Sequence, residues 1–485
     1  MIPEMKNPML NPTRPSELKI MKPVLLIVAL LCWLPVRSAS QETLTIERAV
    51  TTALELNQSL RGAQHDLEST GWGKKNAYSN FLPRVTVDAG LTRIDPETDQ
   101  RANAALDFIR ASAGALGIPS SMLANLKPFS YRDTYSTGVT IVQPVYNGGA
   151  EIVGVKAANA LEEKSEYSYK DTEQDVIARV RTSYYNVLSA QELVSLMRES
   201  MERTKRYVET TRRREELGMR TRTDVARWEV QLASDEGSLI KAENLLSLAR
   251  LQLNEVMGVD LNREYTLAPV VDAADTVSAT AAGSGPLLAS LGGMPAEPQL
   301  SFADLELHPS WQAMDANLRL AETGVDRSWT AFQPRVNVAF QYGWERNSTL
   351  RLDGYKPWAL ALSVSFPIFN GFGDYANLQR AREDYDRAQS QVASFRRGLL
   401  LQATNARLNV RAARQRIEVA RKAQQQALDV LNAVTRRYET GGASNVDLID
   451  VQTAYTSAKV NFITSLYDYY VANVQLARAT GTITL

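Results

Sequence analysis

The chain has 485 residues, and its 54 lysines and arginines balance its 54 aspartates and glutamates, so that its formal net charge is zero. This balance argues against a basic nucleic-acid-binding surface. The two histidines, His65 and His308, match no metal or catalytic-triad spacing, and we find no phosphate-binding loop or nucleophile motif. We therefore expect no enzyme activity, no cofactor and no nucleic-acid partner.

Residues 1–40 are typical of a secretory signal peptide. Lys22 precedes an apolar stretch at 24–34, and small residues follow up to Ser40. The stretch is shorter than the roughly 18 apolar residues of a membrane-spanning helix. The only cysteine, Cys32, lies inside it, and the leucine before that cysteine does not suit a lipidation signal. We expect an exported chain without thiol chemistry.

The rest of the chain contains two similar halves. Two Pro-x-Tyr/Phe-Asn-Gly motifs begin at Pro144 and Pro367, which are 367 − 144 = 223 residues apart. The same shift separates Gly218 from Gly441. A constant shift over distant motifs predicts an internal two-fold repeat and one elongated architecture rather than separate globular domains.

The two repeats are expected at 41–268 and 300–485. Residues 269–299 between them are rich in alanine, glycine, serine and proline, which favours an irregular linker. Each repeat is predicted as a helix, two strands, a long helix and a shorter helix. The opening helix of the first repeat is expected at about 45–81.

Two strands follow in each repeat, at about 84–93 and 135–146 in the first and at about 335–345 and 357–369 in the second. Apolar and polar residues alternate along all four, as a sheet with one apolar face requires. Each strand has about the 9–11 residues that cross a bilayer. The first repeat holds 28 extra residues, placed in a long loop at 96–133 whose 106–116 segment is predicted to be helical.

Aromatic residues gather at both ends of the second strand pair, as interfacial girdles would. They are Trp344, Tyr355 and Trp358 at one end and Phe366 and Phe369 at the other. A soluble sheet packed on a core is the alternative. The charged residues Arg84, Asp88 and Arg335 on the opposite face favour a membrane sheet with a wet inner side.

Long helices are predicted at 148–217 and 371–440, and shorter ones return at 224–257 and 447–480. The long stretches lack proline, and apolar or small residues recur in them every seven positions. These residues are Val180, Val187, Val194, Met201 and Val208 in the first repeat and Ala403, Val410, Ile417, Gln424 and Leu431 in the second. The heptad spacing predicts two coiled-coil hairpins.

A four-stranded sheet cannot span a bilayer alone, because its edges would present unsatisfied backbone groups to lipid. Two copies would give eight strands, whose interior the side chains nearly fill, whereas three copies would give twelve strands and an open bore. We therefore expect a mixed α and β membrane protein: a homotrimer with one twelve-stranded barrel and a tube of coiled-coil helices.

The proline before each first strand, the Pro-x-Tyr/Phe-Asn-Gly motif after each second strand and the Gly-to-Asp helix turns occur in the order found in TolC-type outer membrane efflux proteins. The chain resembles that family over essentially its whole mature length. The resemblance implies a homotrimer in the lipid of a Gram-negative outer membrane, with a twelve-stranded barrel joined to a periplasmic helical tunnel.

The same resemblance implies two partners, a periplasmic adaptor and an inner membrane pump of the RND, ABC or MFS type. The chain would then be the exit duct of a tripartite efflux or type I secretion system. The sequence leaves the cargo and the energy source of the pump open. The alternative function is an elongated periplasmic coiled-coil scaffold without transport activity.

The resemblance also implies that the tunnel closes at the helix turns farthest from the membrane. Asp447 and Asp450 occupy the places of acidic gate residues; they share one helix face, so that three chains would bring six carboxylates together. Tyr438 occupies the place of a tyrosine that ties neighbouring tip helices. For Asp447 and for Asp224 in the first turn, helix capping is the alternative role.

The family's tip arginine is replaced here by Ala443, whereas Arg220 and Arg222 lie in the first turn. Arg220 with Asp447 is one candidate pair, and a solvated Arg220 is the alternative. The apices Leu217-Gly218 and Thr440-Gly441 resemble segments that contact the adaptor.

Overall fold

The computed structural model describes residues 43–123, 126, 128–269, 301–346 and 356–484. The predicted signal peptide, nearly all of the predicted linker and Tyr355 lie outside this part of the chain. The chain divides into two units. In the smaller one, β1 (Thr43–Leu44) pairs in parallel with β4 (Thr266–Leu267). The larger unit, Thr45–Arg263 with Pro269–Leu485, carries the helices and the main sheet.

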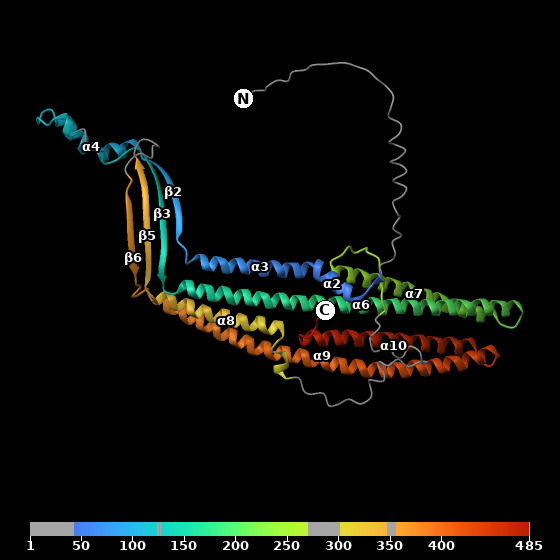
Figure 1. Cartoon of the computed structure of the whole chain (residues 1–485). Coiled ribbons are helices and arrows are strands. Elements are labelled where there is room, and N and C mark those ends of the chain that lie inside the picture. The colour runs from blue at the N-terminus through green and yellow to red at the C-terminus, as the bar shows by residue number, and fades with distance from the viewer. Residues whose placement is uncertain (1–42, 124–125, 127, 270–300, 347–355, 485) are drawn as a thin grey trace, which may run out of the picture. The chain divides into compact units, whose positions relative to one another are not determined.

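The main sheet has four antiparallel strands in the order β2-β3-β5-β6 (Figure 1). They are β2 (Arg84–Arg93), β3 (Asp133–Asn147), β5 (Arg335–Arg346) and β6 (Trp358–Ser365). The prediction of a mostly helical chain with four antiparallel strands is confirmed. The two outer strands, β2 and β6, each have one edge without a partner in this sheet.

The strand register aligns apolar side chains on one face of this sheet. One row across the four strands consists of Val87, Val139, Tyr342 and Trp358, and the next row consists of Val85, Ile141, Phe340 and Leu360. Because successive side chains point to opposite faces, the residues between these rows face the other way. One such row consists of Thr86, Thr140, Gln341 and Ala359. The sheet therefore has one apolar and one largely polar face.

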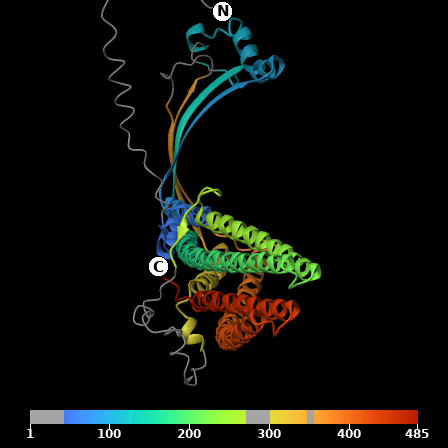
Figure 2. The ribbon, with the colours of Figure 1, turned by 90° about the vertical axis from the view of Figure 1, so that its right-hand side faces the viewer.

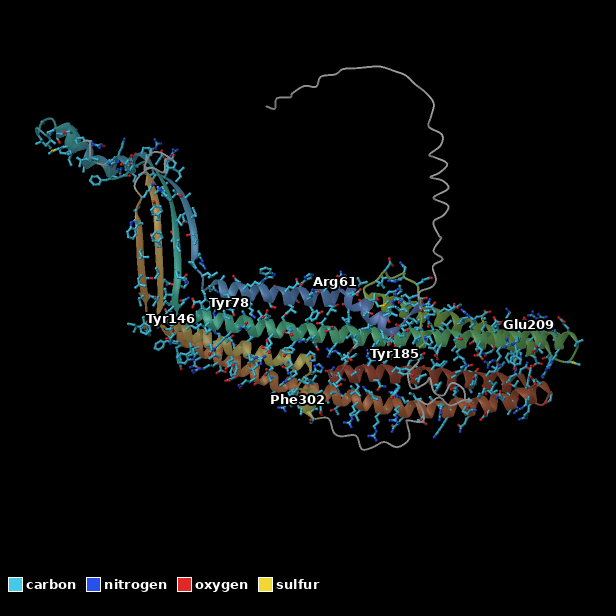
Figure 3. The ribbon with its side chains drawn as sticks, in the orientation of Figure 1. Arg61, Tyr78, Tyr146, Tyr185, Glu209 and Phe302 are labelled. Atoms are coloured by element: carbon cyan, nitrogen blue, oxygen red, sulfur yellow. The ribbon has the colours of Figure 1, made fainter. Side chains whose placement is uncertain are left out.

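Two long helices, α6 (Ala150–Glu216) and α9 (Gly373–Glu439), each contain 67 residues. Their first residues are 373 − 150 = 223 apart, and so are their last. α6 packs against α7 (Arg222–Met257), and α9 packs against α10 (Asn445–Ala479), as two helical hairpins (Figures 1 and 2). Figure 3 marks the two ends of α6, with Tyr146 just before its start and Glu209 near its turn.

The heptad positions form much of the buried seam of the hairpins. Val180 and Val187 are fully buried on α6, and Ala403 is fully buried on α9. α6 also packs against α10, α8 (Pro309–Trp329) and α3 (Gln58–Ser79). No helix among the described residues is long and apolar enough to cross a bilayer.

The entry into each long helix uses left-handed backbone. Gly148 and Gly149 have φ values of 67° and 80°, and Gly371 and Phe372 have values of 57° and 62°. A Cβ atom on Gly148 would lie 2.5 Å from the main-chain oxygen of Thr330, so that only glycine fits there. The Asn-Gly motifs are thus turns that connect the sheet to the long helices.

The helix predicted at about 45–81 is in fact two helices, α2 (Ile46–Leu56) and α3. Asn57 has extended backbone, and its Oδ1 accepts from the main-chain N–H groups of Ser59 and Leu60. Its Nδ2 donates to the main-chain oxygen of Val256 at 2.7 Å. The break arises because Asn57 caps α3 and binds the end of α7, a long-range contact that helical periodicity does not reveal.

The loop between β2 and β3 contains more helix than the predicted 106–116 segment. α4 (Pro96–Ser112) begins directly after β2, and α5 (Ser120–Leu123) follows. Asp95 caps α4 by accepting from the main-chain N–H groups of Glu97 and Thr98, and Pro96 occupies the first turn. This start signal explains the early beginning of the helix.

Candidate gate at the ends of the helical hairpins

The two hairpin turns are built in the same way. Leu217 and Thr440 end the long helices, and Gly218 and Gly441 follow with φ values of 71° and 82°. Thr221 and Ser444 then cap the returning helices α7 and α10. The glycines allow the left-handed conformation that ends a helix, and the hydroxyl residues satisfy the first N–H groups of the next helix.

Asp224 and Asp447 complete these caps. The Oδ2 atom of Asp224 accepts from the main-chain N–H of Thr221 at 3.1 Å, and that of Asp447 accepts from Ser444 at 3.0 Å. These main-chain bonds are the chief reason why the pKa of each carboxyl lies below its usual value. The capping role expected as an alternative is therefore observed, and it holds both aspartates in their charged form.

Asp450 follows Asp447 at a spacing of three on α10, and both side chains are exposed in the single chain. Asp447 uses one carboxylate oxygen for the cap, which leaves its charge in place at the turn. Their convergence in a trimer stays a prediction.

A direct link joins the first turns of α7 and α10. The side-chain Nδ2 of Asn445 donates to Oδ1 of Asp224 at 3.1 Å and to its main-chain oxygen at 3.2 Å. Asn445 is only 2 % exposed. We did not predict this residue, since an asparagine at the start of a helix gives no sign of a partner 221 positions away.

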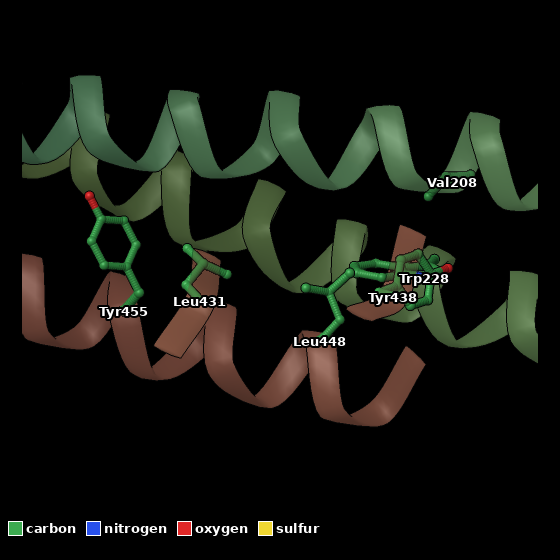
Figure 4. Packing of buried hydrophobic residues seen from close by; sticks show 6 residues of the cluster. All are labelled: Val208, Trp228, Leu431, Tyr438, Leu448 and Tyr455. Carbon is green, nitrogen blue, oxygen red and sulfur yellow. The ribbon is translucent and has the colours of Figure 1, made fainter. Parts of the chain in front are cut away.

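Tyr438 lies in a buried cluster behind the turns, together with Val208, Trp228, Leu431, Leu448 and Tyr455 (Figure 4). Trp228 is fully buried, and its ring stacks on Tyr207 at 4.8 Å between centroids. Tyr438 meets both rings edge-on, at 6.1 Å from Tyr207 and 6.5 Å from Trp228. Burial also raises the pKa of Tyr207, which therefore stays protonated.

The hydroxyl of Tyr438 lies 3.4 Å from that of Thr211 on α6, which is a long hydrogen bond. The aromatic contacts therefore hold this tyrosine more firmly than its hydroxyl does. The importance of Trp228 was not predicted. It lies on the shorter returning helix α7, and only the packing of four helices identifies it.

Arg220 packs over the same tyrosine. Its guanidinium carbon lies 5.2 Å from the ring centre of Tyr438, and that of Arg214 lies at 5.9 Å. Cations are attracted to the face of an aromatic ring at such distances. The predicted pairing of Arg220 with Asp447 remains a prediction.

The apices predicted to meet an adaptor are exposed. Leu217 is 73 % exposed, and Gly218, Thr440 and Gly441 are exposed as well. The first turn is the more apolar, because Met219 is exposed next to Leu217, whereas the second turn has Thr440 at its apex. A partner that contacted both turns would therefore meet two different surfaces.

Farther from the turns, polar contacts join α6 to α10. Glu199 pairs with Lys459 at 3.3 Å and with Arg203 on its own helix at 2.8 Å. Burial alone would raise the pKa of Glu199, but these two cations outweigh it and lower the pKa. Glu192 accepts from the hydroxyl of Tyr467 at 2.8 Å. These contacts fix the position of α10 on α6 behind the turns.

Comparison with known proteins identifies a family. A family model described as "Outer membrane efflux protein" matches residues 49–259 and 303–482, which is more than half of the chain. The outer membrane protein TolC of Vibrio cholerae is 23 % identical over 354 residues, covering 72 % of this chain and 77 % of that protein. The cobalt-zinc-cadmium resistance protein CzcC of Cupriavidus metallidurans is 26 % identical, covering 82 % of this chain and 90 % of that protein.

The fold is also found among solved structures. The outer membrane channel CmeC of Campylobacter jejuni superposes with a TM-score of 0.74 at 18 % identity, covering 90 % of this chain and 85 % of that one. At this identity the likeness concerns the fold alone.

Proposed function

The chain belongs to the outer membrane efflux protein family, and on this premise we propose that three copies form an exit duct across the outer membrane and into the periplasm. Each copy contributes four strands to a twelve-stranded barrel, and the helical hairpins of its two repeats contribute to a tunnel. The duct passes substrates that an inner membrane pump delivers.

One observation carries this proposal: the apolar rows of the sheet are exposed on the two outer strands and only half-buried on the two inner ones. Leu362, in the middle of β6, is 68 % exposed, and Val87 on β2 belongs to the same face with a similar exposure. In water such a continuous apolar face is unfavourable, whereas it matches the hydrocarbon of a bilayer. The polar opposite face would then line a wet lumen.

The unpaired edges of the sheet are an argument for the proposed trimer. β2 and β6 lie at the two ends of the strand order, so that each has backbone groups without a partner in this sheet. In lipid these groups must be paired, and pairing β2 of one chain with β6 of the next closes a barrel without edges. Three chains provide twelve strands, which leave an open bore, whereas two provide eight, which the side chains would fill.

Exposed apolar residues on the hairpins support the same assembly. Leu401, Leu408, Val419 and Val430 on α9 are spaced by seven and eleven residues and therefore lie on one helix face. On α7, Val230 and Ile240 are exposed as well. A neighbouring chain would cover these faces in the helical tunnel, as heptad seams are covered in a coiled coil.

The turns would close the tunnel at its periplasmic end. Tyr438, Arg220 and the Asn445–Asp224 link hold the two hairpins of one chain together, and Asp447 and Asp450 would form a ring of six carboxylates in three chains. Leu217, Gly218, Thr440 and Gly441 would contact a periplasmic adaptor. An inner membrane pump of the RND, ABC or MFS type completes the proposed assembly, which serves either efflux or type I secretion.

The proposal is tested on the purified chain in detergent and in a planar lipid bilayer. We expect a heat-resistant trimer that contains β-structure and conducts ions. A monomeric, purely helical product that never inserts would contradict the duct and favour a periplasmic scaffold instead.

A further inference from the structure

A polar cavity of about 340 Å³ lies between α6, α7 and α10. It is next to the buried cluster of Tyr438 and Trp228, called the aromatic cluster below, on the side that faces away from the turns. Serine, threonine, glutamine and asparagine side chains form most of its wall, and Asp235 is the one charged residue among its described lining residues. Since α10 belongs to one hairpin and α6 and α7 belong to the other, the cavity lies between the two hairpins.

Asp235 brings a negative charge to the cavity, and its carboxylate oxygens are bonded to neutral groups. Its Oδ2 accepts from the hydroxyl of Thr204 at 2.6 Å, and its Oδ1 accepts from the amide of Gln231 at 2.8 Å. No lysine or arginine is among the described residues that line the cavity. Asp235 is half-buried, and a carboxylate in such a position without a cationic partner attracts a cation from solution.

Three hydroxyl groups of the wall have already donated their protons and can only accept. Thr204 donates its proton to Asp235, Ser238 donates to the main-chain oxygen of Ser234, and Thr453 donates to that of Ile449. A hydroxyl whose proton is already donated offers only its lone pairs to another group. These three side chains therefore suit metal-bound water molecules, whose protons point away from the metal.

Gln452 adds an unsatisfied group to this wall. The residue is only 7 % exposed, and its buried Nε2 atom has no hydrogen-bond partner. Leaving a buried amide nitrogen without a hydrogen-bond partner is unfavourable, so this group needs one. The two ends of a glutamine amide have nearly the same shape, so that a half-turn of the amide places Oε1 at the buried position, where it accepts a hydrogen bond or binds a cation.

We propose that this cavity binds a hydrated divalent cation, with Asp235 as its anionic ligand and the hydroxyls of Thr204, Ser238 and Thr453 as acceptors for its water molecules. Mg²⁺ fits this chemistry best, because it keeps several waters and binds proteins through one or two carboxylates. No group of three or more metal-binding histidine, cysteine or acidic residues occurs in the described part of the chain, so that this site differs from a fully protein-ligated metal centre.

A cation at this position would connect the two hairpins. Asp235 lies on α7 and Gln452 on α10, and Gln452 is placed between Leu448 and Tyr455 of the aromatic cluster. Binding would therefore add a contact between the hairpins next to Tyr438 and Trp228. This inference does not depend on the duct function, because a single chain supplies all the described residues that line the cavity.

The test is isothermal titration calorimetry of the full-length protein in detergent, first stripped with a chelator and then titrated with MgCl₂ or CaCl₂ at constant ionic strength. We expect about one cation for each chain, with a dissociation constant on the order of 1 mM or below. Asp235→Asn should weaken binding by more than about tenfold. Gln452→Glu should tighten it, because it adds a second carboxylate at the buried position.

Asp429→Asn is the matched control. Asp429 also accepts from a glutamine four residues earlier on its helix, Gln425, but it is exposed and does not line the cavity. Absence of measurable binding by the wild-type chain overturns the proposal, as does equal binding by the Asp235 and Asp429 variants. Conductance is measured separately, so that a chain that binds the cation but forms no channel contradicts only the duct function.

Discussion

Asn445 bonds to Asp224 twice, through the carboxylate Oδ1 at 3.1 Å and the main-chain oxygen at 3.2 Å. Asn445 begins α10, and Asp224 lies in the first turn of α7. The returning helices of the two hairpins are therefore tied together at the turns, by a side chain that is shielded from water.

Replacing Asn445 with alanine should loosen this link. The change removes both hydrogen bonds and leaves the main-chain oxygen of Asp224 without this donor, at a cost of about 1–2 kcal/mol. We expect faster tryptic cleavage at Arg220 and Arg222 and a higher single-channel conductance. The control is Asn473→Ala, because the amide of Asn473 bonds only to Tyr469 on its own helix. Equal cleavage of both variants would show that the link does not hold the turns.

The acidic pair should govern ion selectivity. Replacing Asp447 and Asp450 together with asparagine removes two charges from each chain, while the side-chain oxygen of an asparagine at 447 can still accept from the main-chain N–H of Ser444. We expect a lower preference for cations and weaker block by divalent or trivalent cations in bilayer recordings. Asp468→Asn, an exposed position farther along α10, should leave both properties unchanged. Unaltered selectivity in the double variant would exclude the carboxylate ring.

Trp228 should matter more for closure than the hydroxyl of Tyr438. Trp228→Ala empties a fully buried site at the centre of the cluster, which costs about 3–5 kcal/mol. Tyr438→Phe removes only a hydroxyl with a 3.4 Å contact to Thr211. We expect conductance of the isolated trimer to rise modestly for Tyr438→Phe and clearly for Trp228→Ala. A closed channel in both variants would place the constriction elsewhere.

The two faces of β6 should respond differently to the same charge. Leu362 belongs to the apolar face and pairs with Val338, whereas its neighbour Ser363 pairs with Asn337 on the other face. Leu362→Arg should destabilise the inserted trimer by about 2–4 kcal/mol for each chain. Ser363→Arg should be tolerated and should reduce cation conductance instead. Heat resistance of the trimer in detergent is the measurement, and the reverse order of the two variants would contradict the assigned faces.

His308 should make stability depend on pH. Its Nδ1 accepts from the main-chain N–H of Ser310 at 3.2 Å, and its Nε2 lies 3.2 Å from the main-chain oxygen of Arg478. Burial chiefly lowers the pKa of His308 below 6.5, and the charge of Arg478 adds to this effect, while Asp171 opposes it. The unfolded chain therefore binds the proton more readily than the folded one does.

It follows that the contribution of His308 is complete above pH 6.5 and is lost as the pH falls through its folded-state pKa. The variant His308→Asn keeps a capping acceptor but does not titrate in this range. We expect the difference in unfolding midpoint between wild type and variant to shrink on acidification from about pH 7.5 to about pH 5. A constant difference would mean that the histidine does not titrate there.

Local patterns made several elements predictable. Alternation marked the strands, the absence of proline and the heptads marked the long helices, and the Gly-to-Asp spacing marked turns whose caps are now seen at Asp224 and Asp447. These features depend on residues within a few positions of one another. For this reason the sequence also indicated the roles that the aspartates have at their helix starts.

The tertiary structure alone decided the contacts between distant segments. These contacts break the first helix at Asn57, bury Trp228 and pair Asn445 with Asp224. They also place Asp235 in a cavity between the two hairpins. The neighbouring sequence of each of these side chains gives no sign of its long-range contact. Periodicity describes which face of an element is apolar. The partner of a polar group depends on the packing of whole helices, which brings together distant residues such as Glu192 and Tyr467, 275 positions apart.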